Sequence, residues 1–66
     1  MTNTIRIERA IKNMTQEELA NEVSVSRQTI NAMEGNKYVP STILSLKIAR
    51  FFNKYVEEVF ILEKGD

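Results

Sequence analysis

The sequence predicts an all-α domain of five short helices, and three observations support this prediction. The 66 residues are enough for one domain around a single core. Apolar residues recur at helical spacing in short stretches that Ser, Thr, Asn, Gly and Pro separate. Apolar residues make up 42% and charged residues 27%, which is typical of a folded chain rather than a disordered one. We therefore expect a single domain over residues 1–66.

The first helix is expected over about residues 5–13. Ile7, Ile11 and Met14 follow one another at i, i+4 and i+7, the spacing of one helix face, and Ile5 is a further apolar candidate. This pattern predicts that Ile7, Ile11 and Met14 form the buried stripe of the first helix. Residues 1–4 have no helical character.

A clear start signal precedes the second helix, which is expected over residues 16–23. Thr15 and Glu18 have the spacing of a capping box, in which each side chain accepts a hydrogen bond from a free amide at the helix start. The inward residues of this helix are Leu19, Ala20 and Val23.

The third helix is expected over residues 27–34, with Ser26 as its cap and with Ile30 and Met33 inward. Gly35 stands where a helix commonly ends in a left-handed residue, so we expect it to be the terminator. Asn36 would prolong the turn.

The fourth helix is expected over about residues 42–52 and the fifth over about residues 56–60. Residues 37–40 form a loop, because the residue before a proline avoids the helical region. The apolar run 60–62 favours a strand, which we expect to pair with residues 1–4 in a small two-stranded sheet. Ser41 is the expected cap of the fourth helix, Asn53 its terminator, and Leu44, Ile48, Phe51 and Phe52 its core stripe.

The second and third helices, joined by residues 24–26, have the spacing of a helix-turn-helix over about residues 16–35. Such helices cross steeply through a turn of three or four residues, and the small Ala20 lets their backbones meet. Gln and Asn side chains can pair a donor and an acceptor with adenine, and Arg can bind guanine with two donors. The residues left outward on the third helix are of these polar kinds: Ser26, Arg27, Gln28, Thr29, Asn31 and the small Ala32.

These motifs resemble a known family. The runs Gln16–Ala20, Val25–Ile30, Glu34–Gly35 and Pro40–Ser41 are similar to those of lambda-repressor-type (xenobiotic response element) helix-turn-helix regulators. The runs 26–31 and 36–38 resemble most closely the short stand-alone repressors of the cytolysin-repressor type. The resemblance extends over about residues 5–60, and it implies a transcriptional regulator, most simply a repressor.

The resemblance also implies roles for individual residues. Gln16 and Ser26 would contact phosphates at helix N-termini; Arg27, Gln28 and Asn31 would face base edges; Thr29 would line the groove wall; and Asn36, Lys37 and Tyr38 would touch the DNA backbone. Lys37 as a solvated charge and Tyr38 as a loop-packing aromatic stay open as alternatives. Arg9 and Glu34 would join the first helix to the third. Glu8, Ser24, Lys54 and Tyr55 depart from the family pattern, none of them on the proposed DNA face.

The C-terminal part, about residues 51–63, holds more apolar side chains than one short helix can bury. We therefore expect a homodimer with a two-fold interface there, and two recognition helices roughly 34 Å apart on an inverted-repeat operator in double-stranded DNA. The expected interface residues are Phe51, Tyr55, Val56, Val59, Phe60 and Leu62.

Several classes of function are excluded by composition. The chain has no His and no Cys, the usual bases, nucleophiles and soft metal ligands, so we expect no enzyme, no metal, no cofactor and no small-molecule ligand. No apolar run is long enough for a membrane span, and a cytoplasmic location is expected. The alternative to a repressor is a protein-interaction module, such as an antitoxin or adaptor, with the same fold.

The net charge of zero seems at first to oppose DNA binding, but the charges are unevenly distributed. Residues 23–56 hold five basic residues against Glu34 alone, whereas acidic residues dominate the two ends. Phosphate binding depends on the local cations, so we expect specific contacts to carry a large share of the affinity and the salt dependence to be shallow.

Overall fold

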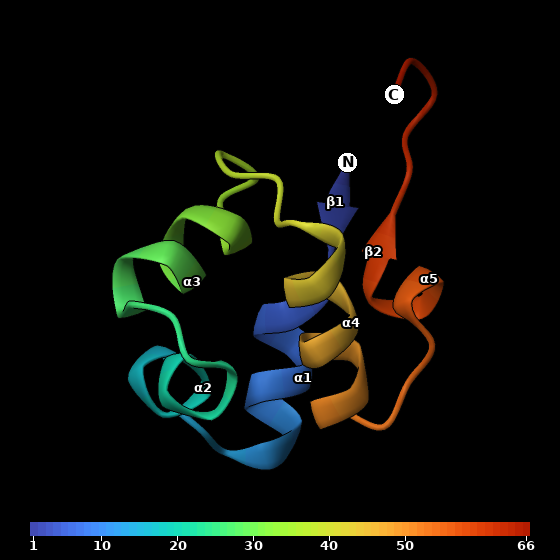
Figure 1. The fold of residues 1–66 in the computed structure, drawn as a ribbon. Coiled ribbons are helices and arrows are strands. Elements are labelled where there is room, and N and C mark those ends of the chain that lie inside the picture. Colours follow the sequence, from blue (N-terminus) through green and yellow to red (C-terminus); the bar gives the residue numbers. More distant parts are fainter.

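The five helices and the small sheet are confirmed by a computed structural model that describes all residues, 1–66. A short strand precedes the first helix and pairs with a strand that directly follows the last one (Figure 1). The elements are β1 (Thr2–Asn3), α1 (Ile5–Lys12), α2 (Gln16–Val23), α3 (Arg27–Glu34), α4 (Thr42–Phe51), α5 (Val56–Val59) and β2 (Phe60–Ile61).

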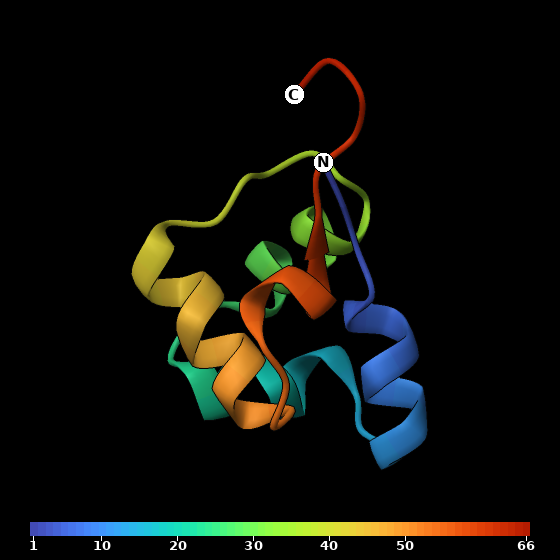
Figure 2. The ribbon, with the colours of Figure 1, turned by 90° about the vertical axis from the view of Figure 1, so that its right-hand side faces the viewer.

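The two chain ends lie at the same end of the molecule, and both views show this arrangement (Figures 1 and 2). β1 and β2 are antiparallel, with Thr2 opposite Ile61 and Asn3 opposite Phe60. The Thr4 amide continues this pairing by donating to the Val59 carbonyl at 2.9 Å. α2 and α3 form one side of the molecule, and α5 lies on the other side beside α4 (Figure 1).

One apolar core joins all five helices and β2. The inward residues predicted for the second and third helices are buried there, as are Leu44, Ile48 and Phe52 from the predicted stripe of the fourth, whereas Phe51 is only half-buried. Ala49 was not predicted and adds a small buried side chain to α4. The core consists of Ile5, Leu19, Ala20, Val23, Ile30, Met33, Leu44, Ile48, Ala49, Phe52, Val59 and Phe60.

The buried stripe predicted for the first helix is wrong at Ile7 and Ile11, whereas its third residue, Met14, is half-buried against the core. Ile7 and Ile11 are 60% and 73% exposed, and the buried residues of α1 are Ile5 and Glu8. The cause lies outside the helix, because Arg9 must face α3 to reach Glu34, and this requirement turns the face of Ile5 inward. The Glu8 carboxylate forms an ion pair with Lys54 Nζ at 3.4 Å. Glutamate at this position departs from the family pattern.

The helix caps follow the sequence signals except at the end of α3. Thr15 forms the predicted capping box with Glu18, and Ser26 and Ser41 cap α3 and α4 through their hydroxyl oxygens. Gly35 is not the left-handed terminator, since its φ is −84°, whereas Asn36 has φ 60°. The chain turns one residue later, where Lys37 donates its amide to the Ala32 carbonyl at 2.9 Å.

None of the helices combines the length and the apolar character that crossing a bilayer would require.

Candidate nucleic-acid interface

The turn between α2 and α3 holds the two helices in close contact. Ala20 is 1% exposed, and its carbonyl accepts the amide of Val25 at 3.0 Å. Ser24 takes the left-handed conformation at φ 62°, which ends α2. Val25 packs against the core from the turn. The small Ala20 therefore stands where the two backbones approach, as the sequence predicts.

α3 has one apolar face and one polar face. Ile30 and Met33 are completely buried and fix the helix to the core. Arg27, Gln28 and Asn31, the three residues expected to face base edges, are all exposed. Their spacing of one and three residues places them on the same side of the helix. Rigid packing on one face thus presents a guanidinium and two amides to solvent on the other.

The N-terminus of α3 offers free backbone donors. The Ser26 hydroxyl oxygen accepts a hydrogen bond from the Thr29 amide at 3.2 Å and lies 3.0 Å from the Thr29 hydroxyl. The residue Thr29 is half-buried. Helix geometry gives the amides of Arg27 and Gln28 no acceptor within α3. Unpaired amides and the positive end of the helix dipole favour an anion, so this end of α3 suits a phosphate group.

The loop that follows α3 is supported by β1. Asn3 Nδ2 donates to the Met33 carbonyl at 2.7 Å and to Asn36 Oδ1 at 3.4 Å. Lys37 and Tyr38 lie next in the loop and are exposed, Tyr38 by 45%. Sequence reasoning missed Asn3, since only the pairing of the chain ends brings this strand beside α3. Asn3 fixes the loop that displays Lys37.

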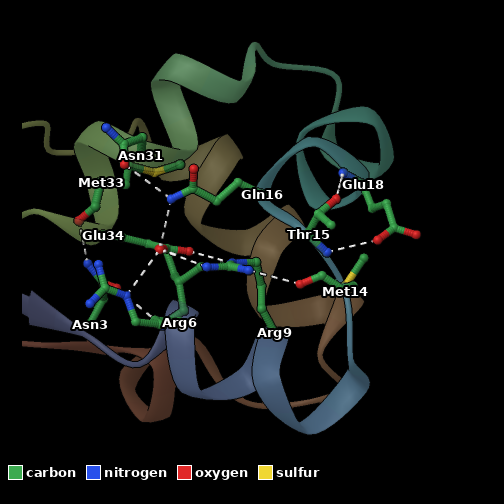
Figure 3. A network of polar contacts seen from close by, with 11 residues as sticks. Asn3, Arg6, Arg9, Met14, Thr15, Gln16, Glu18, Asn31, Met33 and Glu34 are labelled. Carbon is green, nitrogen blue, oxygen red and sulfur yellow. Dashed lines mark hydrogen bonds and ion pairs between the residues drawn. The ribbon is translucent and has the colours of Figure 1, made fainter.

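A buried carboxylate joins α1, α2 and α3 (Figure 3). The Glu34 side chain is 1% exposed, and Arg9 donates to it twice, from Nε at 2.6 Å and from Nη2 at 3.0 Å. Arg9 also donates to the Met14 carbonyl at 2.9 Å, and Arg6 Nε lies 3.5 Å from Glu34 Oε1. The predicted tie between the first and third helices is therefore present, with Arg6 as an additional cation.

The electrostatics of this network favour the charged forms. Burial of Glu34 raises the pKa of its carboxyl, but the hydrogen bonds from Arg9 and Gln16, together with the Arg9 charge, outweigh burial and hold that pKa below its usual value. The hydrogen bond with Glu34 raises the pKa of Arg9. Glu34 is consequently a carboxylate at neutral pH, and it can only accept hydrogen bonds.

Gln16, at the first position of α2, uses its side-chain amide within the protein. Its Nε2 donates to Glu34 Oε1 at 3.1 Å and to Asn31 Oδ1 at 3.2 Å. An amide nitrogen has two hydrogens, so neither is left for the phosphate that this side chain was expected to bind. The backbone amide of Gln16, at the N-terminus of α2, has no acceptor in the helix and keeps that capacity.

Comparison with known proteins agrees with this geometry. The sequence model of the helix-turn-helix family HTH_3, described as "Helix-turn-helix", matches residues 5–59. The chain belongs to this family.

The relatives of this helix-turn-helix protein are similar over almost their whole lengths. It is 51% identical to an HTH-type transcriptional regulator of Methanocaldococcus jannaschii, over 100% of both chains. It is 50% identical to one of Archaeoglobus fulgidus, over 100% of this chain and 93% of the relative. It is 44% identical to the HTH-type transcriptional regulator YgzD of Bacillus subtilis, over 97% of each. The chain is thus a member of the lambda-repressor-like HTH-type transcriptional regulators, a family of regulators rather than enzymes.

The C-terminal surface of this helix-turn-helix protein differs in part from the expected interface. Val59 and Phe60 are 0% and 8% exposed, so they belong to the core of the chain itself and not to an open surface. The pairing of β1 with β2 and the packing of α5 on α4 bury them. Tyr55 and Leu62 are each 76% exposed, whereas Phe51 and Val56 are half-buried against the core.

A groove lies between α4 and α5 of the helix-turn-helix protein. Ile43 and Leu46 line it from α4 and are 69% and 52% exposed, and Tyr55 and Val56 line it from the other side. The α4 side carries cations and the α5 side carries carboxylates. The charged lining residues are Lys47, Arg50, Lys54, Glu57 and Glu58.

Proposed function

We propose that this protein is a sequence-specific DNA-binding repressor that binds a palindromic operator as a homodimer, with α3 in the major groove. The observation that carries this proposal is the two-faced α3. Ile30 and Met33 are buried, and Arg27, Gln28 and Asn31 project from the opposite side. These side chains can bind the donors and acceptors of base edges.

The remaining contacts would position the helix on the DNA. Ser26 and the free amides at the N-termini of α2 and α3 would bind phosphates, and Thr29 would line the groove wall. The loop after α3 would place Asn36, Lys37 and Tyr38 along the DNA backbone. The connection of this loop to β1 through Asn3 supports this assignment, because the loop is held against α3.

The proposed homodimer interface is the apolar surface around Tyr55 and Leu62, extended by the groove between α4 and α5. Exposed apolar side chains line that groove, with cations on one side and carboxylates on the other. A two-fold axis places the basic side of one copy against the acidic side of the other, so the surface can be self-complementary. The pairing of β1 with β2 supports a place within the short cytolysin-repressor type.

Selection from random duplex DNA tests the proposed function. The protein should enrich an inverted repeat and favour it over random DNA by about 10³-fold or more. The double variant with Arg27→Glu and Gln28→Ala should lose this preference and keep its helical circular dichroism, whereas the exposed Asn21→Ala on α2 should retain it. Failure of the wild type to enrich any site would overturn the proposal.

A protein-interaction module such as an antitoxin or adaptor is the second candidate function. It is favoured by the apolar pair Ile7 and Ile11, which α1 exposes on a face away from the core. The same double variant separates the two candidates. Regulation of a reporter that survives loss of the α3 contacts would favour the interaction module.

A further inference from the structure

The Gln16 amide links a buried carboxylate to a side chain on the exposed face of α3. In Figure 3 it points from α2 toward both Glu34 and Asn31. Glu34 has no hydrogen to donate as a carboxylate, so the Gln16 atom that faces it at 3.1 Å must be the amide nitrogen. The Glu34 carboxylate therefore fixes which way the Gln16 amide group points, although an isolated amide group could rotate by 180°.

The orientation of Asn31 follows from that of Gln16. The second hydrogen of Gln16 Nε2 points to Asn31 Oδ1 at 3.2 Å, so Asn31 presents its oxygen to Gln16. Turning the Asn31 amide over would set two NH2 groups against each other and lose this hydrogen bond. The Nδ2 group of Asn31 consequently stays free, on the side of α3 that carries Arg27 and Gln28.

We propose that Glu34 and Gln16 are positioning residues that hold Asn31 with its NH2 group outward, as a hydrogen-bond donor to an acceptor on a base edge. This inference rests on the proposed DNA binding and adds the base class that one residue reads. Guanine, adenine and thymine each present an acceptor in the major groove, whereas the polar group of cytosine there is the N4 donor. The orientation of Asn31 therefore discriminates against cytosine at its contact position.

Two substitutions distinguish a role in positioning Asn31 from a general contribution to DNA affinity. Gln16→Met keeps the length of the side chain and removes the amide, which frees Asn31 to turn over. Asn31→Asp keeps an oxygen for Gln16 Nε2 to bind and replaces the outward donor by an acceptor. Gln16 and Asn31 are not part of the core, and circular dichroism and thermal unfolding of each variant verify that it is folded.

The experiment is selection from random duplexes followed by affinity measurements on the four bases at each position. The wild type defines the site, and Asn31→Ala identifies the base pair whose preference depends on Asn31. We expect the wild type to disfavour cytosine there by roughly tenfold or more relative to the other three bases. Gln16→Met should reduce this discrimination to about threefold or less at that pair alone, and Asn31→Asp should shift the preference toward cytosine. The exposed Asn21→Ala, on the same helix as Gln16, is the matched control and should leave every preference unchanged.

Two results would overturn the inference while leaving the proposed function intact. One is a Gln16→Met variant that weakens all sequences equally, which would assign Gln16 a phosphate contact only. The other is an Asn31→Asp variant that still disfavours cytosine. If the wild type selects no site at all, the proposed function itself fails, and this outcome is distinct from both.

Discussion

Glu34 shows how a single residue connects stability to pH in this fold. Its side chain is 1% exposed, and it accepts hydrogen bonds from Arg9 on α1 and Gln16 on α2. A carboxylate in such a place is stable only with its partners, because removal of one member leaves a buried charge unpaired. Glu34 thus holds three helices in one arrangement, and the proposed positioning of Asn31 is only one of its consequences.

Glu34→Gln should destabilise the protein by about 3 kcal/mol, at the low end for a broken buried ion pair because Arg9 keeps some access to solvent. Urea unfolding monitored by circular dichroism measures this change. The exposed Glu22→Gln on α2 is the control and should alter stability by less than about 0.5 kcal/mol. Equal stability of the two variants would contradict the structural role of Glu34.

The pH dependence of stability should also involve Glu34. Its pKa in the folded chain lies below the usual value of 4.5, so the unfolded chain binds more protons as the pH falls. The stability that the charged form contributes is full above about pH 4.5 and is lost as the pH drops through the lower folded pKa. Unfolding midpoints between pH 3 and pH 7 should therefore fall on acidification less steeply for Glu34→Gln than for the wild type.

At the scale of the elements, capping residues define where the helices begin and left-handed residues define where four of them end. Ser26 and Ser41 cap α3 and α4 in the same way, each accepting the amide three residues later. Asn13, Ser24, Asn36 and Asn53 have positive φ at or just after the ends of α1, α2, α3 and α4. Asn tolerates this conformation well, whereas Ser24 is strained there.

Ser26→Ala and Ser41→Ala form a matched pair. Each should cost about 1 kcal/mol of stability because each removes one N-cap hydrogen bond. Only Ser26→Ala should also weaken binding to the selected operator, since Ser26 lies at the end of α3 that is proposed to meet phosphate. Thermal unfolding and fluorescence-anisotropy titrations measure the two effects. Equal losses of DNA affinity would remove Ser26 from the interface.

Ser24→Gly should stabilise the protein. The left-handed conformation costs about 1 kcal/mol or more for Ser, and glycine removes this cost at the expense of a more flexible unfolded chain, which leaves a net gain of about 0.5 kcal/mol. Urea unfolding checks the sign. A loss of stability would show that the Ser24 side chain has a favourable role in the turn.

The sequence predicts most of the elements of the molecule because capping residues and apolar spacing are local signals. It fails where local spacing takes no account of an interaction that is distant in sequence. The pairing of Arg9 with Glu34 and the pairing of the chain ends are both expected, yet helix spacing still places Ile7 and Ile11 in the core, and Val59 is assigned to an interface. For the candidate site, the outward residues of α3 could be predicted from periodicity, but the bond from Gln16 to Asn31 needs the crossing of two helices.

For the whole molecule, the uneven charge should give a shallow salt dependence of DNA binding. Lys37 is the one cation of each protomer that is proposed to meet phosphate, so the slope of log K against log salt should be about −2 for a dimer. Lys37→Ala should bring the slope close to zero, because a dimer loses both of these cations. Lys64→Ala in the C-terminal tail is the control and should leave the slope unchanged. A slope like that of a strongly basic protein would contradict the expected contacts.

The pairing of Thr2 with Ile61 spans nearly the whole length of the chain, and this has a consequence for the order of folding. The packing of α2 on α3 and of α4 on α5 joins neighbours in sequence, so each helix pair closes only a short loop. Pairing the two ends closes a loop of nearly the whole chain, and its entropy cost is lower once the other elements have folded. We expect the sheet to form last and to open first. In amide hydrogen exchange, Thr4, which donates to Val59, should lose protection before Ile30 in the centre of α3.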